Sequence, residues 1–261
     1  MEARNTNSIV TDYFDQIFLH DMEKVQMMKR MDTKYWFEKN QLQSILDAIS
    51  SHYYLLQIDG ENKMSYLTTY FDTIDNELYG AHHNGKLNRY KIRKREYLNS
   101  GIGFLEIKFK NNKGKTNKKR IPTNIKETGF SKEEINFIES ITPYNGEQLN
   151  TALTNEFTRL TLVNKNFKER CTIDLDLSYR YNNKKVELNN LVIVEIKSDG
   201  KPELSPLVLA LRENRIKAAG FSKYCVGRTI TDSEIKRNSF KEKIREIKKI
   251  TRLENDPYLI N

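Results

Sequence analysis

Residues 89–95 read RYKIRKR, so that Arg89, Lys91, Arg93 and Arg95 share one face of a predicted strand. The same period-two alternation recurs at 104–110, 170–177 and 192–197, where charged side chains lie on one face and apolar ones on the other. Four like charges in a row repel one another unless an anion neutralises them. The alternation therefore predicts a sheet whose charged face meets an anion.

An ordinary antiparallel sheet with its charged face in water is the alternative interpretation. The like charges on one strand, and predicted helices that would cover the apolar faces, favour a barrel with a polar interior. The predicted fold class is α+β: a closed antiparallel β-barrel of about eight strands, with a basic interior and flanking helices.

Apolar periodicity assigns the remaining elements. It predicts strands at 65–73, 77–82, 86–98, 103–112, 117–121, 156–164, 169–177 and 190–198, and helices at 8–28, 39–50 and 233–253. Ser131 and Glu134 form a capping box for a helical insertion within 122–146. Ser205-Pro206 opens another helix, which Gly220 can close.

This pattern predicts one domain over 1–261. An N-terminal helix (1–29) precedes a barrel with helical insertions (30–230), and a C-terminal helix (231–261) follows.

Charge is concentrated locally. The chain has 44 Lys and Arg against 35 Asp and Glu, and 13 of the basic residues fall between Lys86 and Arg120 with only two acids. Its two cysteines indicate neither a disulfide framework nor a zinc site. The longest apolar run, 207–211, is too short to span a bilayer, so we expect a cytoplasmic protein.

Five strings resemble the VTC (vacuolar transporter chaperone) domain family, in the family's order, over roughly 30–230. They are Arg-x-Asp-x-Lys-Tyr-Trp (30–36), Thr-x-Tyr-Phe-Asp-Thr (68–73), His-x-Gly-Lys-x-x-Arg-Tyr-Lys-x-Arg-x-Arg (83–95), Leu-Glu-x-Lys (105–108) and Phe-Ser-Lys-Tyr (221–224). The resemblance implies a CYTH-like triphosphate tunnel metalloenzyme, whose eight-stranded barrel holds a triphosphate. Characterised fungal members extend polyphosphate from ATP with a divalent cation.

The resemblance also implies site residues. The phosphate clamps, taken as catalytic, are Arg93, Arg95, Lys108, Arg159 and Arg170. Further phosphate-binding residues are Lys34, Lys118 or Lys119, Ser222 and Lys223, and Glu195 is the metal ligand. The charged faces add Lys91, Lys110 and Lys197 as phosphate-binding residues. They also add Glu106, with Asp174 as its alternative, as a second metal ligand. Gly220 departs from the family pattern, which has a lysine there, and Arg30 and Asp32 replace the Glu-x-Glu of the wider superfamily.

The predicted function is a polyphosphate polymerase, a transferase that uses ATP and Mn²⁺ or Mg²⁺. A metal-dependent triphosphatase or NTP hydrolase and a non-catalytic polyphosphate binder are the alternatives. Nucleic acid is not an expected partner, because inward-facing charges cannot reach a duplex. His82 and His83 are expected in a solvated turn. The sequence leaves open the oligomeric state and a membrane partner that would hold the protein at the inner face of a membrane.

Overall fold

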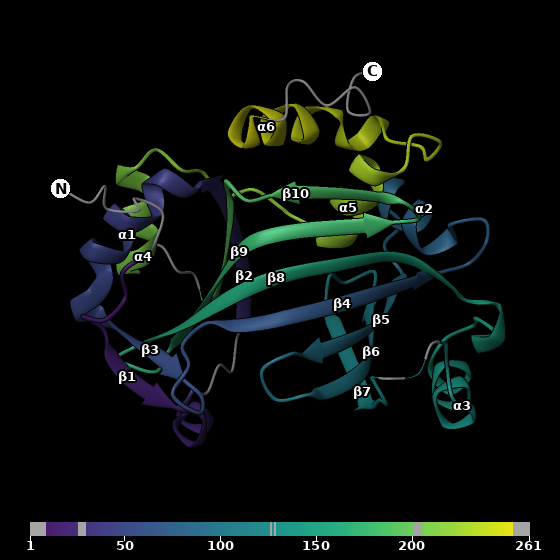
Figure 1. Cartoon of the computed structure of the whole chain (residues 1–261), viewed down its shortest axis with the longest axis horizontal. Coiled ribbons are helices and arrows are strands. Elements are labelled where there is room, and N and C mark those ends of the chain that lie inside the picture. The colour runs from purple at the N-terminus through teal and green to yellow at the C-terminus, as the bar shows by residue number, and fades with distance from the viewer. Residues whose placement is uncertain (1–8, 26–29, 126, 128, 201–204, 253–261) are drawn as a thin grey trace. The chain divides into compact units, whose positions relative to one another are not determined.

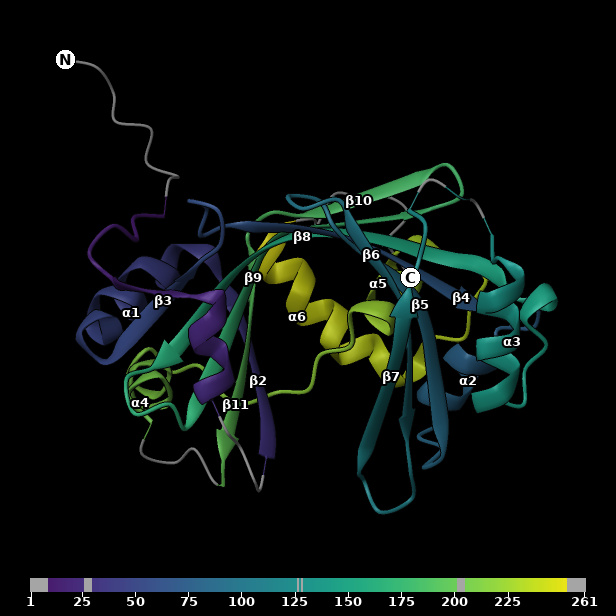
Figure 2. The ribbon, with the colours of Figure 1, turned by 90° about the horizontal axis from the view of Figure 1, so that it is seen from below.

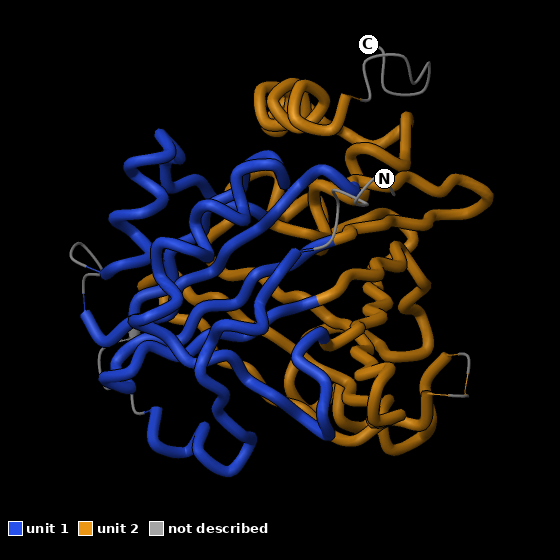
Figure 3. The backbone as a smooth tube through the Cα atoms, turned by 60° about the vertical axis from the view of Figure 1, so that its left-hand side comes forward, with its two compact units in different colours: residues 1–63, 159–175, 189–221 blue, residues 64–158, 176–188, 222–261 orange. Residues whose placement is uncertain are grey.

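The computed structural model describes residues 9–25, 30–125, 127, 129–200 and 205–252 (Figure 1). Its contacts divide the chain into two compact units, each made of three segments (Figure 3). Unit 1 comprises 1–63, 159–175 and 189–221, and unit 2 comprises 64–158, 176–188 and 222–261. Two long strands, β8 (Asn150–Asn164) and β9 (Glu169–Tyr181), contribute residues to both units.

Unit 1 is a sheet packed against two helices. Its other strands are β1 (Asp15–Phe18), β2 (Arg30–Glu38), β3 (Tyr53–Gln57) and β11 (Leu191–Asp199). Its helices are α1 (Leu42–Ile49) and α4 (Pro206–Glu213), with short 3-10 turns at Leu19–Lys24, Lys39–Gln41 and Ser50–His52. Strand β11 lies between β2 and β9, antiparallel to both.

One face of the unit 1 sheet is apolar. Tyr35, Ile173 and Val194 lie on it and form one core with Ile45 of α1 and Leu211 of α4. Because side chains alternate along a strand, the intervening residues point to the opposite face. The two helices therefore cover one face of the sheet and leave the other to the charged residues.

Unit 2 contains the remaining elements. Its strands are β4 (Met64–Asp72), β5 (Arg89–Tyr97), β6 (Ile102–Lys110), β7 (Thr116–Pro122) and β10 (Lys184–Leu188). Its helices are α2 (Glu77–His83), α3 (Lys132–Ile141), α5 (Lys223–Thr231) and α6 (Lys241–Thr251), with 3-10 turns at Gly146–Gln148 and Asn238–Phe240.

The apolar face of β4, β5 and β6 packs on α3 (Figure 2). Phe71, Ile92, Leu105 and Ile107 are buried there together with Ile138 of the helix. Arg93 and Glu106 alternate with these core positions and point to the other face, whereas Lys94 lies on the core face and pairs with Glu134 of α3.

The main path of the sheet has eight strands in the order β2-β11-β9-β8-β4-β5-β6-β7. The pairs β2–β11, β9–β11, β4–β5, β5–β6 and β6–β7 are antiparallel, and β1 pairs with β3 in parallel. Among the described strands this path begins at β2 and ends at β7 without closing. The α+β antiparallel prediction is confirmed, whereas the hydrogen bonds do not form the expected closed barrel.

Most predicted elements are present. The predicted strands at 65–73, 86–98, 103–112, 117–121, 156–164, 169–177 and 190–198 correspond to β4, β5, β6, β7, β8, β9 and β11, and the helix at 39–50 to α1. Ser131 and Glu134 form the predicted capping box of α3, and the Ser205 hydroxyl accepts a hydrogen bond from the Val208 amide at the start of α4. Capping signals are local, so the sequence alone predicts them well.

Two predictions were wrong. Residues 77–82 are not a strand but belong to α2, because the Asp72 carboxylate accepts hydrogen bonds from the Leu78 and Tyr79 amides and fixes the first turn. The described part of 8–28 is not an α-helix but β1 followed by a 3-10 turn, with Ile17 buried against β3.

Two helix ends also differ from the predictions. Helix α4 ends at Glu213, well before Gly220, because Asn214 caps it through its side-chain amide and the Ala210 carbonyl. The final helix is shorter than 233–253 and begins at Lys241. None of the described helices is long and apolar enough to cross a membrane.

Candidate functional site

The charged face of unit 1 centres on Glu195. The register places Glu195 of β11 between Lys34 of β2 and Thr172 of β9. Lys34 Nζ lies 3.1 Å from one carboxylate oxygen, and Lys197 Nζ lies 3.6 Å from the other. Burial alone would raise the pKa of Glu195, but Lys34, Lys197 and Arg159 outweigh it and hold that pKa below its ordinary value. Glu195 is therefore ionised at neutral pH.

A second ion pair lies on the same face. Arg159 of β8 donates two hydrogen bonds to Asp174 of β9, Nε to Oδ1 at 2.6 Å and Nη2 to Oδ2 at 2.9 Å. Only 4% of the Asp174 side chain is exposed. This bidentate geometry fixes the guanidinium plane. Arg170 lies opposite Lys197 in the register, so the predicted residues of unit 1 occupy one face of one sheet.

Trp36 Nε1 and Thr172 Oγ1 are buried polar atoms on this face that have no hydrogen-bond partner among the described residues. The register puts Thr172 opposite Glu195, and Trp36 two residues along β2 from Lys34. An indole N–H is a donor only, and a hydroxyl can donate as well. Because buried donors are normally satisfied, the two atoms point to an acceptor-rich ligand beside Glu195.

The charged face of unit 2 centres on Glu106, whose side chain is completely buried. Arg93 donates to Glu106 Oε2 from Nε at 2.8 Å and from Nη2 at 2.6 Å, and Lys118 Nζ donates to Oε1 at 2.5 Å. Burial would raise the pKa of Glu106, but Arg93, Arg95 and Lys118 outweigh it and hold that pKa well below its ordinary value. The ionised Glu106 carboxylate thus joins Arg93 of β5 and Lys118 of β7 across three neighbouring strands.

Basic residues dominate the rest of this face. Lys91 lies opposite Lys108, which in turn lies opposite Lys118, and Arg89 lies opposite Lys110. Counted by strand register, eight basic side chains and one acid share the face: Arg89, Lys91, Arg93, Arg95, Lys108, Lys110, Lys118 and Arg120, with Glu106. Like charges directly across a strand pair repel each other, so this arrangement favours an anionic ligand.

Arg95 and Lys119 have other environments. Arg95 is buried, its Nε donates to Thr68 Oγ1 at 3.3 Å, and its guanidinium lies over the rings of Tyr66 and Phe157. Lys119 pairs with Ile107 and therefore points to the opposite face from Lys118. Of the two alternatives, Lys118 lies on the charged face and Lys119 lies on the apolar face.

Helix α5 brings Ser222 and Lys223 to unit 2. Ser222 is the N-cap residue, and its hydroxyl accepts hydrogen bonds from the Cys225 amide at 3.3 Å and from Lys91 Nζ at 3.2 Å. Lys223 Nζ lies 4.4 Å from the centre of the Phe157 ring. The start of α5 is therefore linked to the charged face through Lys91.

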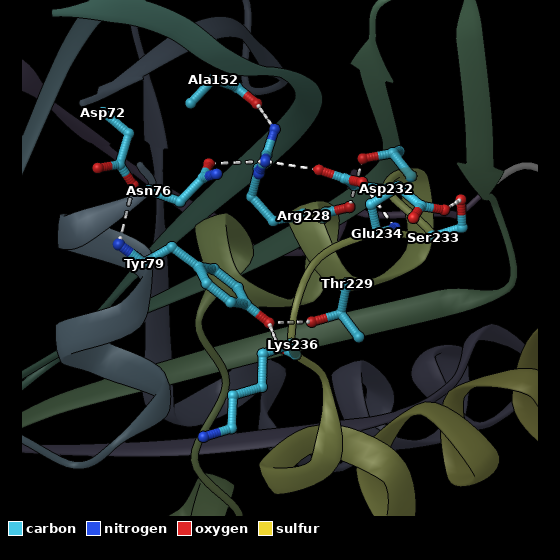
Figure 4. A network of polar contacts seen from close by, with 12 residues as sticks. Asp72, Asn76, Tyr79, Ala152, Arg228, Thr229, Asp232, Ser233, Glu234 and Lys236 are labelled. Carbon is cyan, nitrogen blue, oxygen red and sulfur yellow. Dashed lines mark hydrogen bonds and ion pairs between the residues drawn. The ribbon is translucent and has the colours of Figure 1, made fainter. Parts of the chain in front are cut away.

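A buried network holds α5 in place (Figure 4). Arg228 is 1% exposed and donates to the Ala152 carbonyl, Asn76 Oδ1 and Asp232 Oδ2 at 2.7–2.8 Å. Tyr224 donates to the same Asp72 carboxylate that caps α2. Nothing in the spacing of these residues marks them as neighbours, so the sequence alone does not predict this network.

The two predicted metal ligands differ in fit. No group of three or more His, Cys, Asp or Glu side chains that could hold a metal occurs in the described part of the chain. Both oxygens of Glu106 already accept from Arg93 or Lys118. Glu195 also has a lysine near each oxygen, but its side chain is 19% exposed and the contact with Lys197 is 3.6 Å long, so it can join phosphate oxygens and water around a cation. Mg²⁺ is commonly bound by one or two carboxylates and the phosphates of its substrate.

Comparison with known proteins identifies the fold and the domain. The family model of the VTC domain matches residues 29–231. The chain is similar to the solved structure of a candidate adenylate cyclase from Bacillus halodurans, with a TM-score of 0.50 and 13% identity over 75% of this chain and 94% of that one. Another similar structure, from Hippeastrum, is named as a candidate adenylyl cyclase with a dominant triphosphatase activity. It has a TM-score of 0.49 and 14% identity over 77% of this chain and 96% of that one. The comparison with curated proteins finds no match.

Proposed function

Because the chain belongs to the VTC domain family, we propose that it is a polyphosphate polymerase that transfers the terminal phosphoryl group of ATP to a growing polyphosphate chain. The observation that carries this proposal is that arginines on two basic sheet faces are held by buried carboxylates, Arg93 by Glu106 and Arg159 by Asp174.

Phosphoryl transfer requires the protein to position the reactants and to compensate negative charge, more than to take part covalently. Basic sheet faces with fixed arginines can meet both requirements. The reaction breaks the bond between the γ-phosphorus of ATP and its bridging oxygen. It forms a bond from that phosphorus to the terminal oxygen of the chain and releases ADP. Arg93 and Arg159 would hold phosphate oxygens in fixed orientations, whereas Lys91, Lys108 and Lys110 would act as mobile point charges along the chain.

A divalent cation is the expected cofactor. Glu195 would hold Mn²⁺ or Mg²⁺ together with substrate phosphates, and the bound ion would neutralise charge on the phosphate oxygens. Lys34 and Lys197 keep Glu195 ionised before the metal arrives. Trp36 Nε1 and Thr172 Oγ1 would donate to phosphate oxygens next to it.

The test is to incubate the purified protein with ATP and Mn²⁺, and separately with Mg²⁺. Polyphosphate is resolved on a gel, and ADP and free phosphate are measured in parallel. Long chains with matching ADP release are expected. Free phosphate without chains would move the assignment to a tunnel hydrolase, and binding of polyphosphate without turnover with either metal would indicate a non-catalytic binder.

Variants locate the activity. Arg93→Ala in unit 2 and Arg159→Ala in unit 1 should each reduce turnover at least about 100-fold, the usual range for an electrostatic donor to the reacting group. Arg159→Lys should recover little, because it keeps the charge and loses the bidentate fork. Arg180→Ala, at an exposed position of β9, is the matched control and should leave turnover unchanged. Full activity of both Arg93→Ala and Arg159→Ala would refute the proposed site.

Glu195→Gln tests the metal assignment. It should weaken the dependence of turnover on Mn²⁺ and reduce Mn²⁺ binding in the presence of a non-hydrolysable ATP analogue. Unchanged metal binding would remove Glu195 from the metal site.

A further inference from the structure

One end of the charged face of unit 2 carries no acidic side chain in its strand register. At the centre of the face Arg93 lies opposite Glu106, but further along β5 Lys91 lies opposite Lys108 and Arg89 lies opposite Lys110. Directly opposed like charges destabilise a strand pair. This end of the face is therefore where an anion would relieve the most repulsion.

Helix α2 contacts β5, the strand that carries Arg89 and Lys91, and its penultimate residue, His82, has an unusual environment. His82 Nδ1 is buried and has no hydrogen-bond partner among the described residues. Burial, followed by the charges of Lys91, Arg89, Lys243 and Lys110, lowers the pKa of His82 to about 3. The imidazole is therefore neutral at physiological pH, and a neutral imidazole can donate one hydrogen bond.

The start of α6 packs on the same part of α2. The Phe240 ring stacks on His82, with centroids 6.3 Å apart, and meets His83 edge-on at 5.8 Å. His83 Nε2 also accepts a hydrogen bond from the Ser239 amide at 3.3 Å. These contacts fix the first turn of α6 relative to His82.

Lys243 lies one turn after Phe240 on the packed face of α6, which continues to the buried Ile247. The Lys243 side chain is half-buried, and burial lowers its pKa although Cys225 and Glu246 act in the opposite direction. Lys243 therefore places a positive charge on the face of α6 that packs towards α2. Helix α6 also lies outside residues 29–231, so the family match does not cover it.

We propose that His82 and Lys243 join Arg89, Lys91 and Lys110 to form a phosphate-binding site, here called the α2–α6 site. Its ligand is a phosphate group of a polyanionic chain, with Lys91 and Lys110 as point charges and Arg89 and Lys243 at the sides. His82 donates to a phosphate oxygen from Nδ1. The identification of the ligand as polyphosphate rests on the proposed function, whereas binding of a phosphate group does not.

Binding of tripolyphosphate, measured by titration calorimetry without ATP or metal, tests this site directly. Lys243→Gln should weaken binding about tenfold, the effect of losing one charge-assisted contact to phosphate. Lys249→Gln is the matched control, since it makes the same change at an exposed position of the same helix and should have no effect. Lys243→Arg should retain binding, and unchanged thermal melting of each variant shows that α6 is intact.

The second measurement observes His82 itself. In ¹⁵N-labelled protein at pH 7, tripolyphosphate should shift the His82 Nδ1 resonance, and it should do so less in the Lys243→Gln variant. Titrations with inorganic phosphate and with ATP distinguish the source of the phosphate group. Equal affinity of Lys243→Gln and wild type, or an unmoved His82 resonance at saturation, would overturn the proposal. Because no step requires turnover, a failed polymerase assay leaves this result interpretable.

Discussion

Substituting Glu106 by Gln should destabilise the protein substantially. The Glu106 carboxylate is completely buried and accepts three charge-assisted hydrogen bonds, two from Arg93 and one from Lys118. Removing one partner of a buried ion pair costs about 3–5 kcal/mol, because the other charge stays buried without compensation. Lys118 is 39% exposed and can turn to solvent, whereas Arg93 is only 12% exposed. We therefore expect the lower end, a loss of about 3 kcal/mol in the free energy of unfolding.

The pH dependence follows from the direction of the pKa shift. The pKa of Glu106 is lowered in the folded state, so the carboxylate contributes stability above the ordinary glutamate pKa of about 4.5. That contribution is lost as the pH falls below the ordinary value towards the folded one. The stability difference between wild type and Glu106→Gln should accordingly be constant from pH 6 to 8 and shrink below about pH 4.5.

Urea unfolding followed by far-ultraviolet circular dichroism measures this difference at each pH. The control is Glu187→Gln, which removes an acid paired with Lys185 where both side chains are about half exposed. Such a surface pair contributes about 0.5 kcal/mol or less. A loss below about 1 kcal/mol for Glu106→Gln, or the same pH profile in both variants, would show that the buried group does not stabilise unit 2 as argued.

Two further substitutions test the anchoring of α5. Gly227→Ala should lower the free energy of unfolding by about 1–3 kcal/mol, because the new Cβ would lie 2.4 Å from a methyl group of Leu153. The control is Gly80→Ala in α2, where nothing lies near the Cβ position, and it should raise the free energy of unfolding by about 0.5–1 kcal/mol. Equal effects of the two substitutions, measured by thermal or urea unfolding, would contradict this account of the packing of α5. Tyr224→Phe should lose about 1–2 kcal/mol because Asp72 loses a buried donor, and a neutral result in the same unfolding experiment would show that this hydrogen bond is dispensable.

The sequence predicted the strands well because the period-two signal is local. Strands β5, β6, β9 and β11 each carry several alternations of charged and apolar residues, and the predicted bounds are close to those observed. Strand β7 has a polar residue at nearly every position, so its pattern marks neither face. The choice between Lys118 and Lys119 therefore required the register with β6.

The sequence could not predict which acid meets which base. Arg159 and Asp174 are 15 residues apart on neighbouring strands, and Lys34 and Glu195 are brought together only by pairing of β2 with β11. The error at α2 has the same origin. The carboxylate of Asp72, at the end of β4, caps the helix, and a strand-like pattern of six residues does not reveal that contact.

Pairing with buried acids stabilises the arginines of a basic face before an anionic ligand binds. A buried guanidinium without a partner is costly, so Arg93 needs Glu106 in the folded protein. A guanidinium has five N–H donors, and Glu106 takes two of them from Arg93 just as Asp174 takes two from Arg159. The acid thus fixes the plane of the arginine through two of its five donors. Lysines cannot be fixed in this way, since their charge is a single mobile point. At the centre of the unit 2 face Glu106 therefore fixes the plane of Arg93, whereas Lys91, Lys108 and Lys110 further along the face supply charges that can move.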